Sequence, residues 1–258
     1  MNNQIQTASE VKDSSLTSTL AHETRAFAAQ SASCFVAAAI AFSVAFTSCN
    51  KDEDGVSEIS GVIDNAAKFS EVTTVRITAR YEAPNGNWTS VVIAESTFSN
   101  GRFTIQLPET VDARYLRTIG FDDEPNIKVS NTKAKMLEIW DVGGYKGNEQ
   151  IAGFSFEKYE ETSTSYSYTS RAWIYVDSNV KIEGKIEDSG KWVDDEDGKE
   201  WEWEETFTWA LDLKKGWNVV YYTEAEAEQG NKYTEKEEFT SKPVSGLRWI
   251  GDLWSDDD

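Results

Sequence analysis

The chain is poor in the residue types that most enzymes use as nucleophiles, bases and metal ligands. It contains one histidine, His22, and two cysteines, Cys34 and Cys49, and all three precede residue 50 of the 258. Residues 50–258 therefore contain no Ser-His-Asp triad, no cysteine nucleophile activated by histidine and no zinc site built from histidine and cysteine. They contain no disulfide either, so a fold in this region depends on its apolar core.

The apolar run near the N-terminus is too short to cross a membrane as a helix. This run, Cys34–Phe46, has 13 residues, whereas a spanning helix needs about 20. Its length and its content of alanine, phenylalanine and valine are typical of the core of a signal peptide. The alternative, a buried N-terminal helix, explains the length but not the abrupt change to the polar sequence Asn50–Gly55.

The end of this run, Phe46-Thr47-Ser48-Cys49, resembles a lipobox, the signal-peptidase II site of bacterial lipoproteins. The resemblance implies that residues 1–48 are removed as a signal peptide and that Cys49 is acylated, with residues 49–55 as a tether. Each buried methylene contributes about 0.8 kcal/mol, so two or three palmitate-like chains on one cysteine hold a protein on a membrane permanently.

The next residues, Lys51-Asp52-Glu53-Asp54, resemble the export signal of surface-exposed lipoproteins of the Bacteroidota. This resemblance implies a lipid-anchored protein of the outer membrane that faces the cell exterior. The stretch Leu213–Tyr221 is similar to a segment of uncharacterised Bacteroidota lipoproteins, which implies family membership and no activity.

Positive charge is scarce. The chain has 25 Lys and Arg residues against 45 Asp and Glu residues, a net charge of -20, and loss of residues 1–48 leaves -19. A chain of this charge repels phosphate backbones, which argues against nucleic acid as a partner. It also repels anionic head groups, so we expect contact with the membrane only through the N-terminal lipid.

Alternation of apolar and polar residues dominates the chain after the tether and predicts β-strands. The first block, residues 56–125, has alternating runs at Thr74–Tyr81 and Phe103–Leu107, and its pattern loosely resembles the small transthyretin-like sandwich domains. We interpret Asp122–Pro125 as a linker to a second β-rich block, residues 126–258.

The clearest strand of the second block is 201–213, where apolar residues occupy one face that we expect in the core, including Trp201, Trp203 and Trp209. Residues 224–229 are compatible with one helical turn, but no apolar stripe would hold such a turn in place. Residues 231–238 are typical of a charged edge strand. The sequence therefore predicts an all-β, mostly antiparallel fold of one or two β-sandwich units.

Ten tryptophans raise the question of carbohydrate binding, because flat rings stack on sugars, but their positions favour a role in the core or as isolated surface rings. Trp88 lies at a predicted turn, and Trp192 and Trp254 flank acidic runs, so these three are candidates for exposed, ligand-stacking rings. The alternative is that they are isolated surface aromatics without a ligand.

The densest acidic cluster is Asp194–Glu200, in which Asp194, Asp195 and Asp197 are calcium candidates. An EF-hand register fails, because its first ligand position falls on Val193 and the flanks are predicted strands. The pattern favours the alternative, a solvated hairpin tip that turns at Asp197-Gly198.

These observations predict a lipid-anchored surface lipoprotein that is a non-enzymatic binding or structural module without a cofactor. Its ligand is expected to be a glycan or a surface protein. The alternative is a carboxylate-based glycoside hydrolase acting on surface polysaccharide, because such enzymes need only two acids. The sequence singles out no pair of acids for that role.

Overall fold

The computed structural model describes residues 55–83, 86–121, 124–193 and 198–254. The predicted signal peptide, Cys49 and the calcium candidates Asp194, Asp195 and Asp197 lie outside these ranges. Within them, no helix has the length and apolar character that crossing a membrane requires.

The predicted all-β, mostly antiparallel fold is confirmed. Among the described residues, only two short 3-10 helices interrupt the strands, η1 (Ala66–Phe69) and η2 (Ala113–Tyr115). The strands are β1 (Glu58–Val62), β2 (Thr74–Glu82), β3 (Trp88–Thr97), β4 (Arg102–Gln106), β5 (Arg117–Thr118), β6 (Ile127–Val129), β7 (Lys135–Ile139), β8 (Asp141–Lys146), β9 (Glu149–Glu161), β10 (Ser165–Val176), β11 (Val180–Val193), β12 (Glu200–Leu213), β13 (Gly216–Gln229), β14 (Lys232–Thr240) and β15 (Arg248–Leu253).

One sheet joins the two halves of the described chain. Its main path runs β3-β2-β8-β9-β10-β13-β14-β12-β11-β6, while β1 and β4 form a separate pair. Because β2 pairs with β8, the block 56–125 is hydrogen-bonded to the block 126–258, and both belong to one compact unit, Glu53–Asp258. The division of these blocks into two domains stays a prediction.

The hairpin formed by β13 and β14 is inserted between β10 and β12. As a result β14 pairs in parallel with β12 and antiparallel with β13. The edge strand predicted at residues 231–238 is therefore wrong, because β14 has a hydrogen-bonded neighbour on both sides. The helical turn that residues 224–229 could have formed is absent, because these residues belong to β13, where cross-strand pairing outweighs the helical propensity of alternating Glu and Ala.

A first apolar core lies between the β1–β4 pair and the neighbouring part of the large sheet. Its centre is Phe154, which is fully buried and packs against the rings of three other phenylalanines. The ring centroids of Phe69, Phe98 and Phe103 lie 5.1, 5.3 and 6.4 Å from that of Phe154.

A second core fills one face of β10, β13, β12 and β11, under the connection that contains β5 and β6. Phe121 of this connection packs edge-on against the buried Trp209, with ring centroids 5.4 Å apart. At Gly184 of β11 the connection comes very close, since an added Cβ would lie 2.2 Å from the carbonyl oxygen of Asn126. Only a glycine allows this approach.

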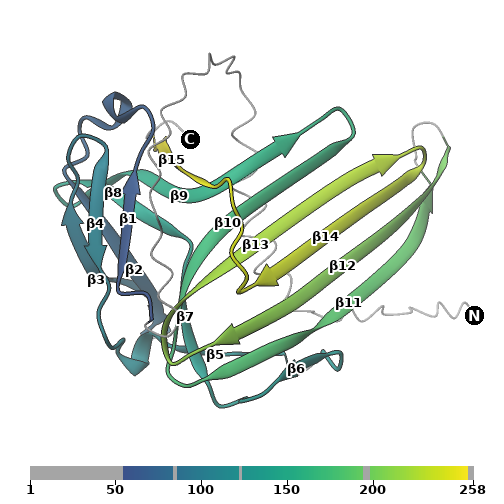
Figure 1. Ribbon diagram of the computed structural model, residues 1–258, viewed down its shortest axis with the longest axis horizontal. Helices are drawn as coiled ribbons and strands as arrows, with labels where there is room; N and C mark the ends of the chain where they lie inside the picture. Colours follow the sequence, from purple (N-terminus) through teal and green to yellow (C-terminus); the bar gives the residue numbers. More distant parts are fainter. Residues whose placement is uncertain (1–54, 84–85, 122–123, 194–197, 255–258) are drawn as a thin grey trace, which may run out of the picture. The chain divides into compact units, whose positions relative to one another are not determined.

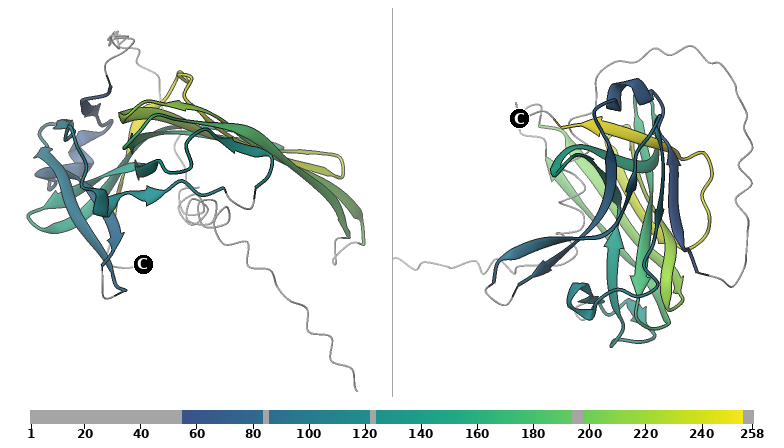
Figure 2. Two further views of the ribbon diagram at one scale, coloured as in Figure 1. Left: turned by 90° about the horizontal axis from the view of Figure 1, so that it is seen from below. Right: turned by 90° about the vertical axis from the view of Figure 1, so that its left-hand side faces the viewer.

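Beyond the second core, the long strands continue as a single layer (Figure 1). Trp140 marks the boundary, with its ring centroid 6.1 Å from Tyr222 and 6.4 Å from Phe239. Trp201 and Trp203 lie in this extension and are therefore half-buried, whereas Trp209 is in the core as expected. The left view of Figure 2 shows the sheet bending toward the side on which the connection with β5 and β6 lies.

Candidate ligand-binding face

The strand register determines which side chains share a face of the single layer. Residues directly opposite each other in neighbouring strands point to the same side. Tyr168 on β10 lies opposite Tyr159 on β9 and Glu224 on β13, and Glu224 in turn lies opposite Glu237 on β14. The face that carries the second core therefore continues outward as tyrosine and glutamate.

We call this continuation the tyrosine–glutamate face. It lies on the side toward which the sheet bends (Figure 2). Its members come from four neighbouring strands and are Glu157, Tyr159, Tyr166, Tyr168, Tyr222, Glu224, Glu226, Tyr233, Glu235 and Glu237.

Glu157 is a buried carboxylate that is satisfied by two tyrosines. Its Oε1 accepts a hydrogen bond of 2.8 Å from the Tyr159 hydroxyl, and its Oε2 accepts one of 2.8 Å from the Tyr168 hydroxyl. Burial, and next the charge of Glu157, raise the pKa of both tyrosines above their usual range. The two hydroxyls therefore stay protonated and act as donors.

Glu237 and Glu224 share a single donor. The Tyr222 hydroxyl lies 2.9 Å from Oε2 of Glu237 and 3.2 Å from Oε2 of Glu224. Burial raises the pKa of Glu237 to about 7; the Tyr222 hydrogen bond opposes this shift, and the charges of Glu224 and Glu235 add to it. Burial likewise raises the pKa of Glu224.

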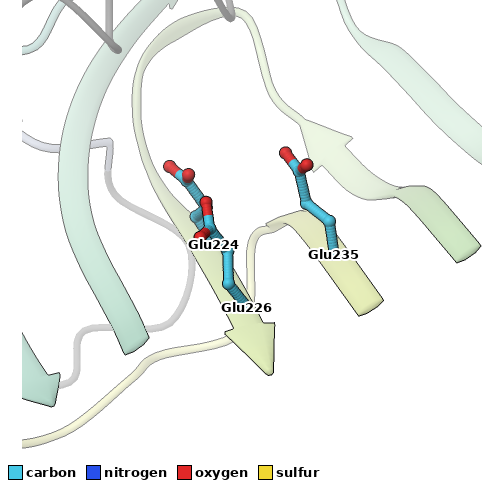
Figure 3. Close-up of side chains that lie close together, drawn as sticks. All are labelled: Glu224, Glu226 and Glu235. Carbon is cyan, nitrogen blue, oxygen red and sulfur yellow. The ribbon is translucent and has the colours of Figure 1, made fainter. Parts of the chain in front are cut away.

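Glu224, Glu226 and Glu235 form the tightest group of carboxylates on this face (Figure 3). An oxygen from each lies within 4.8 Å of the others, and Glu235 is buried. Two of these side chains come from β13 and the third from β14, where Glu226 lies opposite Glu235. Hard oxygen ligands at this spacing are the type that a divalent cation takes.

A row of aromatic side chains on β12 and β11 extends the tyrosine–glutamate face across the strands beyond β14. Trp203 lies opposite Tyr233 of β14, and next along β12 Trp201 stacks on Trp192 with ring centroids 5.6 Å apart and an interplanar angle of 13°. Trp192 is 40% exposed. Flat rings therefore border the carboxylates on the same side of the sheet.

The opposite face of the same strands is electrostatically different. There lysines alternate with acids and form ion pairs; for example, Lys191 Nζ lies 2.8 Å from Glu200 and 3.1 Å from Glu202. Further pairs on that face are Lys232–Glu204, Lys185–Glu187 and Lys181–Asp212. In the described residues of β10 to β14, by contrast, no lysine or arginine points to the tyrosine–glutamate face.

The three tryptophans predicted as stacking rings are all exposed, but they belong to separate elements. Trp88 begins β3, where the Arg80 guanidinium lies 5.8 Å from its ring centroid. Trp254 follows β15 and lies against Gly153. Only Trp192 borders the tyrosine–glutamate face.

Sequence reasoning missed the residues at the centre of this face. The signal was present as two alternating runs, Tyr166-Ser167-Tyr168 and Glu224-Ala225-Glu226, which place residues of one kind on one side of a strand. Their meeting depends on the insertion of β13 next to β10, which the local pattern does not specify.

Comparisons of this chain with protein-family models, with curated proteins and with solved structures found no match.

Proposed function

We propose that the protein is a lipid-anchored surface lipoprotein that works as a non-enzymatic binding module, with the tyrosine–glutamate face as its ligand-binding surface. One observation supports this most: the single layer presents carboxylates and aromatic rings on one face while ion pairs neutralise the other. An acidic and aromatic surface on which the described residues of β10 to β14 place no lysine or arginine is typical of a recognition surface.

The proposed location rests on the sequence. The lipobox-like segment ending at Cys49 supports an acyl anchor, and the run Lys51-Asp52-Glu53-Asp54 supports an outer-membrane position facing outward. The extended layer suits such a position, because a broad sheet face reaches ligands too large for an enclosed pocket.

A carboxylate-based glycoside hydrolase is the second candidate. The observation that favours it is the shared donor Tyr222, which brings the carboxyls of Glu237 and Glu224 within two hydrogen-bond lengths of each other. Glycosidases combine a carboxyl of raised pKa with a second carboxylate nearby. In this role Glu237 is the acid and Glu224 the second carboxylate.

Arrays of glycans and surface proteins test the binding proposal with the full chain solubilised in detergent. We expect retention of a ligand without turnover, and loss of that ligand in Trp203→Ala. Trp88→Ala is the matched control, because it removes an exposed ring on β3, which lies far from β12 in the strand order. Retention that falls in Trp88→Ala and not in Trp203→Ala refutes the face as the binding surface. Release of reducing sugar that is lost in Glu237→Gln supports the hydrolase instead.

A further inference from the structure

The two faces of the single layer differ in how their negative charge is balanced. On the opposite face, lysines of β11 and β14 pair with the acids of β12. On the tyrosine–glutamate face, Glu157 and Glu237 are 5% and 6% exposed, and the hydrogen-bond partners of their carboxylates are tyrosine hydroxyls. Buried carboxylates normally pair with cations, because hydroxyls compensate only part of the lost hydration.

A second polar group on this face is a buried hydroxyl. Ser170 is 3% exposed, and its Oγ makes no hydrogen bond of good geometry, although it lies near enough to the Tyr168 hydroxyl to lower the pKa of that tyrosine. By register it lies between Glu157 on β9 and Tyr222 on β13, so its side chain points into the tyrosine–glutamate face. On β10 to β14, the described residues thus place no lysine or arginine beside the buried carboxylate of Glu237, whereas Arg248 of β15 lies opposite Glu157 at the β9 border of the face.

The chain itself shows which cation fits between tyrosine and glutamate. The Arg76 guanidinium lies 4.5 Å from the ring centroid of Tyr145, and its Nε lies 3.1 Å from Oε2 of Glu95. A guanidinium stacks flat on a ring while its edge binds a carboxylate, whereas an ammonium is a compact charge that cannot do both equally well. The tyrosine–glutamate face offers this pair of partners several times.

Resting on the proposed function, we infer that the tyrosine–glutamate face binds an extended, arginine-bearing segment of a partner protein. The acids lie on three of four adjacent strands, and neighbouring strands are about 4.8 Å apart. A segment that crosses the strands therefore meets Glu157, then Glu224, then Glu237, with tyrosine rings between them. Arginines at alternate positions of such a segment place their guanidinium groups on one side of it.

Binding of a short peptide in which arginine alternates with serine tests the inference, with fluorescence anisotropy at about 150 mM salt so that diffuse attraction is screened. One triple variant of the full chain removes charge from the face: Glu224→Gln, Glu226→Gln and Glu237→Gln. The matched control replaces the same number of glutamates on the opposite face of neighbouring strands: Glu202→Gln, Glu204→Gln and Glu238→Gln. Glutamine keeps the side-chain shape, and circular dichroism verifies that both variants are folded.

We expect the first triple variant to weaken peptide binding by about tenfold or more and the control to change it by less than about twofold. We also expect the matching lysine–serine peptide to bind the wild type several-fold more weakly. Equal losses in both variants, or equal affinity for the lysine peptide, overturn the inference because they indicate attraction to net charge alone.

The array experiment distinguishes the arginine inference from the proposal that the tyrosine–glutamate face is a ligand-binding surface. If the arginine peptide does not bind while an array ligand is lost in Trp203→Ala, the arginine inference fails and the binding face stands. If neither the peptide nor an array ligand depends on this face, both fail.

Discussion

The hydroxyl of Tyr222 on β13 donates a hydrogen bond of 2.9 Å to Glu237, which extends from the neighbouring strand β14. The same hydroxyl also lies 3.2 Å from Glu224, so one donor serves two carboxylates. Because a hydroxyl has only one proton, it stabilises one charge well and the pair poorly. At this point of the tyrosine–glutamate face, two carboxylates therefore depend on one donor.

The stability of the protein is expected to depend on Glu237 in a pH-dependent way. The pKa of Glu237 is about 7 in the fold and about 4.5 for an ordinary glutamate. Between these values the folded state holds a proton that the unfolded state has released, so the free energy of unfolding falls as pH rises. Below pH 4.5 both states are protonated, and above pH 7 the loss is complete.

Glu237→Gln should therefore raise the free energy of unfolding at pH 8 by about 2 kcal/mol and leave it nearly unchanged at pH 4.5. Urea unfolding of variant and wild type at both pH values measures this. Glu238→Gln is the control, because Glu238 is the next residue, is exposed and points to the opposite face. A stabilisation of the same size at both pH values would contradict the assignment.

Tyr222→Phe removes the donor that Glu237 and Glu224 share. The hydrogen bond from Tyr222 lowers the pKa of Glu237, so its loss should move that pKa above 7. Titration of the carboxyl carbon by NMR follows the shift directly. Tyr175→Phe, on the other side of β10 and packed against Trp217, is the control and should leave the titration of Glu237 unchanged. A lower pKa in Tyr222→Phe would show that the hydroxyl does not stabilise the charged form.

Gly184→Ala should detach β6 from β11. The new methyl group would lie 2.2 Å from the Asn126 carbonyl oxygen, a backbone atom that cannot move without breaking the β6–β11 pairing. We expect a loss of about 2 kcal/mol or more in the free energy of unfolding. Gly120→Ala is the control in the same connection, because no atom lies within 4 Å of its added Cβ. Equal stability of the two variants in urea would refute this packing.

Phe154→Ala should destabilise the first core by about 3–5 kcal/mol, since it removes the ring against which Phe69, Phe98 and Phe103 pack. Thermal and urea unfolding measure the loss. Val193→Ala trims a side chain that is 58% exposed and should stay within about 0.5 kcal/mol of wild type. A loss under about 1 kcal/mol for Phe154→Ala would place that ring outside the centre of the core.

Cys49→Ala tests the proposed anchor. If Cys49 carries the acyl chains, the variant should leave the membrane fraction, and its mass should show no lipid. Cys34→Ala changes the other cysteine and should leave fractionation unaffected. Membrane retention of Cys49→Ala at full precursor mass would contradict the lipoprotein proposal.

The alternation of residues predicted the β class and many individual strands, because period two is local information. In 201–213 it assigned the faces correctly, yet it placed Trp201 and Trp203 in the same core as Trp209. The pattern records which side a residue faces and does not record where the covering connection ends. The second core ends at Tyr222 and Phe239, short of both tryptophans.

The site was not predictable for a related reason. Tyr168 and Glu224 meet because β13 pairs with β10, and Glu224 and Glu237 meet because β14 turns back along β13. Read alone, residues 224–229 are compatible with a helical turn and residues 231–238 with an edge strand. Which strands become neighbours is a property of the whole sheet, so the composition of the face emerges only with the topology.

The inserted β13–β14 hairpin also dictates an order of events during synthesis. When residue 213 has been made, β10 and β12 each have an unpaired edge toward the gap that the hairpin later fills. The sheet is complete only after Thr240 has been synthesised. Until then, a nascent or truncated chain has two unpaired strand edges, and such edges promote association with other chains. Removal of this hairpin is therefore expected to turn the protein into an aggregation-prone chain.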